Sequence, residues 1–219
     1  MSKGKLIVLE GLDGSGKATQ AKLLKAHLKE QGFSVREITF PNYESDSSAL
    51  VKMYLAGQFG QHPDDVNAYA ASSFYAVDRY ASYKKDWGSF YENGGIVIAD
   101  RYTTSNAVHQ CSKLPPEQWE EFLHWLFDYE FHLLGLPAPH FAHCPLLLAS
   151  DGRRLSKRDG DQSLENLRAK YTAPEIIGKL AYAYGLQPEP APRTPESLVP
   201  DFAWAKVPKQ DICLPEGLF

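Results

Sequence analysis

The chain has 219 residues, of which 43% are hydrophobic and 23% charged, and a formal net charge of −4. That length suffices for one core, or one core with a small appendage. The acidic balance argues against nucleic-acid or membrane binding through the whole surface and leaves a local basic patch open. The three cysteines form no CxxC pair and no apolar run reaches membrane-spanning length, which excludes a zinc ribbon, a disulfide framework and a transmembrane helix and favours a reducing cytoplasm.

Strands and helices are expected to alternate along the first part of the chain. Short apolar runs that end at Gly, Pro or Asp predict strands, and apolar residues three and four positions apart predict helices. The predicted elements are a strand over 5–10, a helix over 17–29, a strand over 33–40, a helix over 66–86, a strand over 94–100 and a helix opened by Pro115 and Pro116. The first strand, KLIVLE, is apolar almost throughout, which predicts burial on both faces of a parallel sheet. The alternation predicts an α/β domain over residues 1–139.

The pattern changes near GLPAPH, residues 135–140. Beyond it, CPLLLAS (144–150) predicts a strand that can fill one further position of the sheet, and no candidate for a final strand follows. Helical patterns cover 163–170 and 174–185, and the tail after them is rich in proline. We therefore expect a second, mostly helical C-terminal segment over residues 140–219.

GLDGSGK (11–17) follows the first strand and opens the first helix, which is the context that a P-loop requires. Its glycines let the backbone approach phosphates closely, and the amides of the loop and of the helix N-terminus point at them. Lys17 adds a cation at the β- and γ-phosphate oxygens, where phosphoryl transfer needs charge neutralised. The predicted sheet is therefore of the P-loop NTPase type. The nucleotide-binding residues expected here are Gly11, Gly14, Ser15, Gly16, Lys17, Ala18 and Thr19.

One position departs from the general P-loop motif. Ala18 follows the lysine where a Ser or Thr hydroxyl usually binds Mg²⁺, and the side chain of Thr19 points elsewhere on a helix. Magnesium is then expected to be held by phosphate oxygens, water and another carboxylate. Asp100, at the carboxyl end of the third strand, is the candidate metal ligand.

Three further clusters are expected outside the carboxyl ends of the strands, where ligands bind in such sheets. FPNY (40–43) offers Phe40 and Tyr43 for stacking on a base. The helix AVDRYAS carries Arg79, and DRYTTSN (100–106) places Arg101 where its planar fork can clamp a phosphate. Each cluster also has a structural interpretation, as a strand end or a surface ion pair.

Residues 1 to about 139 resemble the thymidylate (dTMP) kinase family. The resemblance rests on GLDGSGKATQ, FPNY, AVDRYAS, DRYTTSNAVHQ and PPEQWEEFLHWLFDYEFHLLGLPAP. It implies phosphoryl transfer from ATP to dTMP with Mg²⁺, and it also implies a homodimer. The Ala18 departure occurs within that family.

The resemblance also implies roles for particular residues. Asp13 lies near the acceptor sugar and Lys17 contacts the ATP phosphates, while Arg101 holds the dTMP phosphate. Phe40 is implied to stack on thymine and Arg79 to bond the edge of that base, and Ser105 and Asn106 are implied to line the base pocket, beside which Tyr43 is the second predicted substrate-binding aromatic.

Residues from about 134 to 219 resemble instead the C-terminal part of glutamyl-tRNA synthetase and of its shortened relative, glutamyl-Q tRNA(Asp) synthetase. FAHCPLLLASDGRRLSKRDGD, EIIGKLAYAYGL and WAKVPKQDICLP carry this resemblance. RLSKR (154–158) stands for the ATP-loop signature of that family. No HxGH-type element accompanies it, so a complete synthetase site is not expected, and neither is tRNA as a partner.

The basic lid of a dTMP kinase is replaced in this sequence. The cations at Arg153, Arg154, Lys157 and Arg158 can stand in for it if their loop folds over the P-loop, so Arg154 and Arg158 are predicted catalytic residues. Three alternatives stay open: a kinase, whether or not impaired by the substituted lid; a synthetase-like fragment; and a mosaic that binds nucleotides without turnover.

Overall fold

The computed structural model describes residues 3–11, 15–155 and 163–219. Contacts divide the chain into two compact units, Met1–His140 (unit 1) and Phe141–Phe219 (unit 2). Asp13, Gly14 and Arg158, which the sequence assigns to the site, lie outside the described residues. No helix in the described ranges is long and apolar enough to cross a membrane.

Unit 1 is built on a three-stranded parallel sheet in the order β1 (Lys5–Leu9), β3 (Ile96–Asp100), β2 (Val35–Thr39). Leu9 and Thr39 both pair with Asp100, so the carboxyl ends of the three strands lie at one level. This confirms the predicted parallel sheet and its three strands. The register brings segments that are far apart in the sequence to a single edge of the sheet.

The burial of the strands differs from the expectation for KLIVLE. β3 lies between its two neighbours, and Val97, Ile98 and Ala99 are completely buried. β1 is an edge strand in the described sheet, and its side chains are half-buried rather than enclosed on both faces. An apolar run predicts a strand, but the number of neighbours decides how far its side chains are buried.

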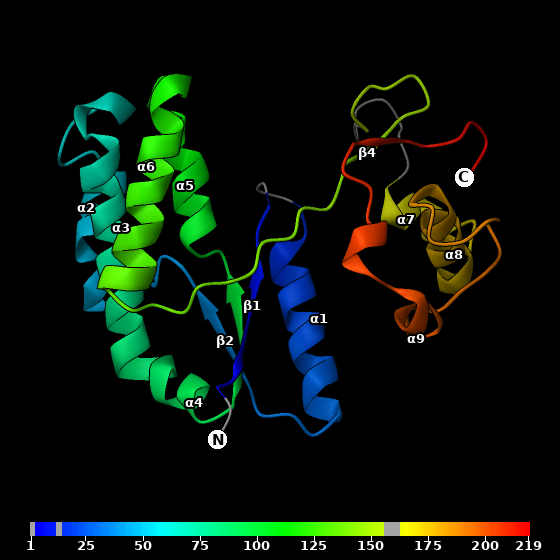
Figure 1. Ribbon diagram of the computed structural model, residues 1–219, viewed down its shortest axis with the longest axis horizontal. Helices are drawn as coiled ribbons and strands as arrows, with labels where there is room; N and C mark the ends of the chain where they lie inside the picture. The colour runs from blue at the N-terminus through cyan, green and yellow to red at the C-terminus, as the bar shows by residue number, and fades with distance from the viewer. Residues whose placement is uncertain (1–2, 12–14, 156–162) are drawn as a thin grey trace. The chain divides into compact units, whose positions relative to one another are not determined.

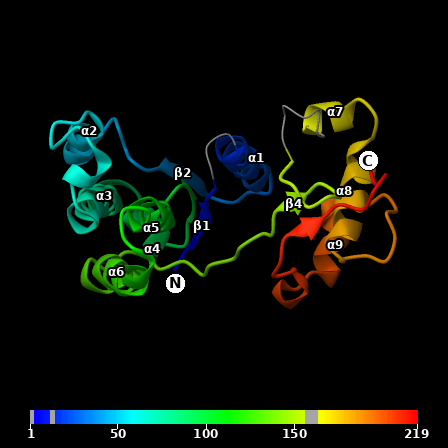
Figure 2. The same ribbon diagram turned by 90° about the horizontal axis from the view of Figure 1, so that it is seen from above.

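Helices flank the sheet on both sides, as predicted (Figures 1 and 2). α1 lies on one side, and the helices of the other side pack on one another. The helices of unit 1 are α1 (Lys17–Glu30), α2 (Ala49–Leu55), α3 (Ala68–Ser82), α4 (Gly88–Glu92), α5 (Thr103–Cys111) and α6 (Trp119–Phe127). Asn67 caps α3 by accepting a hydrogen bond from the Ala70 amide at 2.8 Å.

Two π-helical turns extend helices of unit 1. The turn Tyr83–Trp87 (η3) joins α3 to α4, so the helix predicted over 66–86 continues past its expected end. The turn Asp128–Leu133 (η5) extends α6, which follows the predicted opening at Pro115 and Pro116 through the short turn Pro116–Gln118. Such turns recur at functional sites, and η5 carries Glu130, a buried residue of the site.

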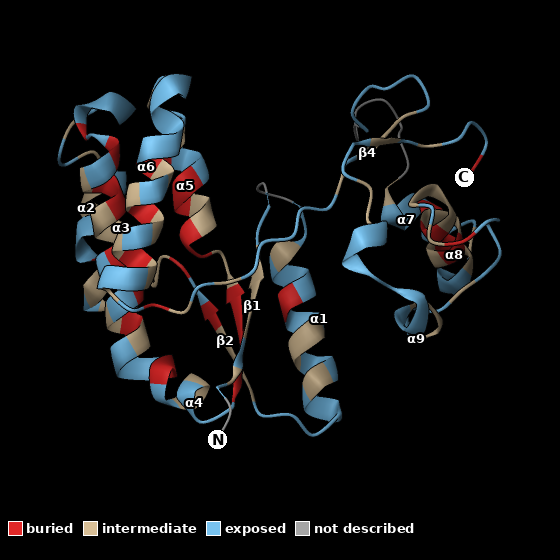
Figure 3. Ribbon diagram, viewed as in Figure 1, coloured by how far each residue is buried: buried red, intermediate tan, exposed pale blue. Residues whose placement is uncertain are grey.

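The core of unit 1 has two parts. One lies on the sheet and includes Phe40, Trp87, Val97 and Tyr102, and the other lies among α3, α5 and α6 around Phe122 and Leu126. Figure 3 shows the buried residues gathered in the sheet and where these helices meet. The site described below lies on the boundary of the first part, so several of its residues are also core residues.

Unit 2 contains the helices α7 (Leu164–Arg168), α8 (Ala173–Ala183) and α9 (Pro195–Leu198) and a two-stranded parallel sheet. The strand predicted over 144–150 is reduced to β4 (Leu147–Leu148), and it pairs with β5 (Ile212–Cys213) and not with the sheet of unit 1. The prediction that CPLLLAS can fill a position in the first sheet is therefore wrong, and a strand follows it for which the sequence offered no candidate. A two-residue strand has too few residues for a periodic pattern, so β5 could not be found from the sequence.

Candidate active site

A cavity of about 500 Å³ lies at the carboxyl ends of β2 and β3. Each predicted substrate- or metal-binding residue within the described part of the chain lines it, namely Phe40, Tyr43, Arg79, Asp100, Arg101, Ser105 and Asn106. These residues come from two strand ends and from α3 and α5. The parallel register explains their meeting, because it brings the strand ends together.

The segment after β2 forms one wall. Phe40 is 4% exposed and packs on Tyr102 with ring centroids 6.0 Å apart, whereas Tyr43 is 54% exposed. The buried carboxylate of Asp78 holds this segment, because it accepts hydrogen bonds from the Asn42 amide at 2.8 Å and the Ser47 hydroxyl at 2.6 Å. Asp78, the aspartate of the Asp-Arg pair on α3, therefore holds the wall of the cavity in place and does not form a surface ion pair.

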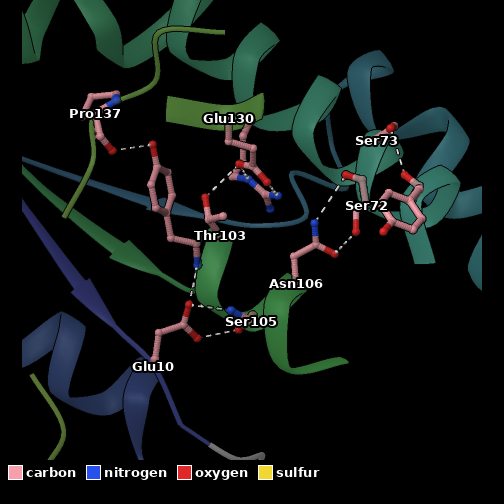
Figure 4. Close-up of polar contacts among 11 residues, drawn as sticks. Glu10, Ser72, Ser73, Thr103, Ser105, Asn106, Glu130 and Pro137 are labelled. Atoms are coloured by element: carbon pink, nitrogen blue, oxygen red, sulfur yellow. Dashed lines mark hydrogen bonds and ion pairs between the residues drawn. The ribbon is translucent and has the colours of Figure 1, made fainter. Parts of the chain in front are cut away.

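The arginine of the same pair is also buried, and its partner is distant in sequence. Arg79 donates from Nε to Glu130 at 2.7 Å and from Nη2 to Glu130 at 2.5 Å. Thr103 donates to the same carboxylate at 2.8 Å, and Figure 4 shows its hydroxyl pointing at Glu130. Burial opposes the charge on Arg79, but attraction to Glu130 and its hydrogen bonds outweigh this and raise the arginine pKa above its usual value.

The turn from β3 to α5 shapes the next part of the cavity. Arg101 has φ of +70°, a left-handed conformation that costs a non-glycine residue of order 1–3 kcal/mol and recurs at functional sites. Its guanidinium donates to the Ser105 hydroxyl at 3.1 Å. Glu10, directly after β1, accepts from the amides of Tyr102 at 2.9 Å and Ser105 at 3.0 Å (Figure 4). Glu10 thus ties the end of one strand to the start of α5.

Asp100 has the properties of a cation ligand. Its Oδ1 is buried and has no hydrogen-bond partner among the described residues. Nor do the described residues contain a group of three His, Cys, Asp or Glu side chains that could hold a metal. Magnesium suits such a place, because it binds through one or two carboxylates and otherwise keeps water and substrate phosphates as ligands.

A second cavity of about 240 Å³ lies beside the first. Glu10 and Gly11, at the start of the loop, line it, and it shares Arg101, Ser105 and His109 with the first cavity. Gly16, at φ +89°, then caps α1, which Lys17 begins. Ser15, Ala18 and Thr19 lie at this junction between loop and helix, as the motif predicted. The P-loop and the larger cavity are thus neighbours through one shared set of side chains.

Several residues of the site were missed from the sequence. Tyr75, His109 and Gln110 also line the larger cavity, and the Gln110 Oε1 is buried without a partner in the described ranges. Burial, followed by the nearby tyrosines Tyr54 and Tyr43, raises the pKa of Tyr75 to about 12, so its hydroxyl keeps its proton at neutral pH. Helical spacing could have found Gln110, four residues after Asn106 on α5. No sequence signal links Glu130 to Arg79, 51 positions away.

The basic segment of unit 2 has a different character. Arg153 donates to Asp151 at 3.2 Å, and both side chains are half-exposed. Arg154 forms an isolated antiparallel bridge with Leu148 and is itself exposed. The role predicted for Arg154 and Arg158 stays a prediction.

The parallel sheet, the P-loop at the start of α1 and the paired cavities define a P-loop α/β protein with a nucleotide-sized pocket. The family model "Thymidylate kinase" matches residues 9–121, just over half of the 219 residues. The chain therefore belongs to the thymidylate kinase family.

The chain is similar to relatives of two kinds, whose matching parts overlap. The thymidylate kinase of Mycobacterium tuberculosis is 30% identical over 166 residues, which cover 74% of this chain and 76% of that protein. The glutamyl-Q tRNA(Asp) synthetase of Symbiobacterium thermophilum is 45% identical over 86 residues of the C-terminal part, which are 39% of this chain and 27% of the synthetase. Among solved structures, thymidylate kinase from Candida albicans is 25% identical with a TM-score of 0.44, over 57% of this chain and 56% of that one.

Proposed function

We propose that the chain transfers the γ-phosphoryl group of ATP to dTMP and produces dTDP. The observation that carries this proposal is the larger cavity, where four aromatic side chains, two arginines and a carboxylate oxygen without a partner among the described residues meet. An oxygen of the acceptor phosphate attacks the γ-phosphorus, the bond to the bridging oxygen breaks, and ADP leaves. Such chemistry depends on positioning and charge neutralisation more than on covalent groups from the protein.

Each residue has a role in this proposal. Lys17 and the amides at the start of α1 hold the ATP phosphates, and Arg101, braced by Ser105, holds the acceptor phosphate. Phe40 and Tyr75 enclose the base, whose edge faces Arg79, Asn106 and Gln110. Asp13 is placed near the acceptor sugar by family resemblance alone.

Asp100 is the proposed ligand for Mg²⁺, which neutralises phosphate charge when it is bound. The buried and unpartnered Oδ1 of Asp100 supports this assignment. We also propose that the chain forms a homodimer, as the kinase resemblance implies. We further propose that unit 2 is a synthetase-like segment that does not bind tRNA, and this rests on the synthetase resemblance.

The test is a coupled assay of ADP formation with ATP, Mg²⁺ and dTMP. ADP should form only when dTMP is present, and Lys17→Ala should lower kcat by at least about a hundredfold, the scale seen when one charge-stabilising contact is removed. Calorimetry should show that dTMP still binds the variant. Absence of turnover in the wild-type chain, with dTMP bound, would mean a nucleotide-binding protein without transfer.

We also propose that Arg154 and Arg158 supply the cations of the missing lid. Their clustering with Arg153 and Lys157 in one short segment supports this idea. Replacing both by alanine should lower kcat about tenfold or more, because lid arginines neutralise charge that develops during transfer. An unchanged rate would disprove the lid role and leave the kinase proposal intact.

A further inference from the structure

Glu130 is a completely buried carboxylate whose partners include a residue that lines the cavity. Its side chain has 0% exposure, and that of Arg79 has 2%. It accepts two hydrogen bonds from Arg79 and one from Thr103, so both carboxylate oxygens are used. The three residues belong to η5, α3 and α5, and Glu130 is thus the point where these elements meet.

This contact orients the guanidinium of Arg79. The Nε and Nη2 edge faces Glu130, and a bidentate pair of this kind fixes the guanidinium plane. Nη1 lies on the opposite edge and makes no hydrogen bond within the described ranges, although Arg79 lines the cavity. One nitrogen of a fixed group is therefore left for a ligand.

Stability alone does not explain such a pair. Removing two charges from water costs about as much as their attraction returns, and apolar residues of similar volume often stabilise a core as well or better. A buried pair beside a cavity is better explained by the orientation that it imposes. Through its hydrogen bond from Thr103, Glu130 also holds the start of α5, the helix that carries Ser105 and Asn106.

We propose that Glu130 is a positioning residue that aims Nη1 of Arg79 at a carbonyl oxygen on the edge of the acceptor base. Because a guanidinium offers only donors, it pairs with a 4-oxo pyrimidine such as thymine and opposes the amino group of a 4-amino pyrimidine such as cytosine. Glu130 thereby maintains selection between the two classes without touching the substrate. This inference rests on the proposed function.

The first test compares wild type with Glu130→Gln, which keeps the shape and removes the charge. We expect KM for dTMP to rise about tenfold while kcat changes little. The ratio of kcat/KM for dTMP to kcat/KM for dCMP should fall about tenfold, which is the scale of one hydrogen bond to a charged group. A purely structural role predicts a lower unfolding temperature and less active protein, with KM and this ratio unchanged.

Thr103→Val covers the case in which Glu130→Gln does not fold. It removes one hydrogen bond to Glu130 and leaves the charge of Arg79 paired, so we expect the same changes at about threefold. The matched control is Asp86→Asn, which breaks the half-exposed Arg36–Asp86 pair away from the cavity and should leave KM and the ratio unchanged.

Binding separates this inference from the proposed function. Calorimetry with dTMP and dCMP gives Kd values whether or not the chain turns over. A wild-type chain that binds neither nucleotide would overturn both proposals. A wild type that prefers dTMP, with the preference intact in Glu130→Gln and Thr103→Val, would overturn the role of Glu130 alone.

Discussion

Two arginines, one in each unit, are held in different ways. In unit 1, Arg79 is buried and pairs with Glu130, 51 positions away, whereas in unit 2 the half-exposed Arg153 pairs with Asp151, two positions away. The first arrangement needs several elements to pack before it forms, and the second needs only a turn. A cluster of basic residues in a sequence therefore does not show a built site until distant partners orient it.

The strands of the two sheets also differ in how far they are buried. β3 has a neighbour on each side and helices over it, so its central residues Val97, Ile98 and Ala99 are completely buried. β4 and β5 are two-residue strands with half-buried or exposed side chains. Short parallel pairs have little stability of their own, so unit 2 depends on packing around α8 more than on its sheet.

The largest effect is expected at the cation ligand of unit 1. Asp100→Asn should lower kcat by about a hundredfold or more. A neutral amide binds Mg²⁺ more weakly than a carboxylate does, and the phosphate charge is then less well neutralised. The affinity for dTMP should change little. The check is a titration of the transfer rate with Mg²⁺, and an unchanged rate at every concentration would remove Asp100 from the proposed site.

Matched truncations in the two cores come next. Ile98→Ala in β3 and Ile176→Ala in α8 should each lower the free energy of unfolding by about 2–5 kcal/mol. The loss for Ile98 should lie toward the upper end, because Ile98 is completely buried. Ile98→Ala should also weaken dTMP binding, because Ile98 belongs to the strand that carries Asp100. Ile176→Ala should leave dTMP binding within about twofold, because Ile176 belongs to the core of the other unit. The measurements are denaturant unfolding and calorimetry. Equal loss of binding in both variants would show that the cavity depends on unit 2.

Matched acids in the two units give a smaller contrast. Asp78→Asn should lower the free energy of unfolding by about 1–3 kcal/mol and raise KM for dTMP. One of the two donors that Asp78 binds, the Asn42 amide or the Ser47 hydroxyl, then loses its acceptor inside the protein. Asp151→Asn should change stability by less than about 0.5 kcal/mol, as is usual for exposed pairs. Urea midpoints of the two variants measure the difference, and equal midpoints would contradict it.

The smallest effect concerns the cap of α8. Hydrogen bonds from Thr172 lower the pKa of Glu175 below its usual value. A carboxyl group whose pKa is lower in the folded state stabilises the fold above the unfolded pKa, and this contribution is lost as the pH falls through the folded pKa. Glu175→Gln should therefore lower the unfolding temperature slightly at about pH 7 and not at about pH 3, on the two sides of the ordinary glutamate pKa. An equal decrease at both values would rule out the charge as the cause.

Local patterns were sufficient for much of unit 1. The apolar runs around β1, β2 and β3, the glycines before Lys17 and the Asp-Arg-Tyr segment after β3 each carry their meaning within about ten residues, the range of strand periodicity and P-loop chemistry. They predicted the parallel sheet, the P-loop and four of the residues that line the cavity, Phe40, Tyr43, Asp100 and Arg101. The roles of Arg79, Ser105 and Asn106 followed from the family resemblance alone.

Tertiary structure decided what those residues can do. The partners of Arg79 and Ser105 are Glu130 and Glu10, 51 and 95 positions away, and the pairing of β4 with β5 joins segments 65 positions apart. A carboxylate on an ordinary stretch of helix has no local mark that names its partner. Sequence by itself thus determined which elements form and which chemical groups stand at their ends. Only packing decided which strand is enclosed, which arginine is fixed and where unit 2 finds its sheet, because burial and buried pairing depend on neighbours that meet only in the folded chain.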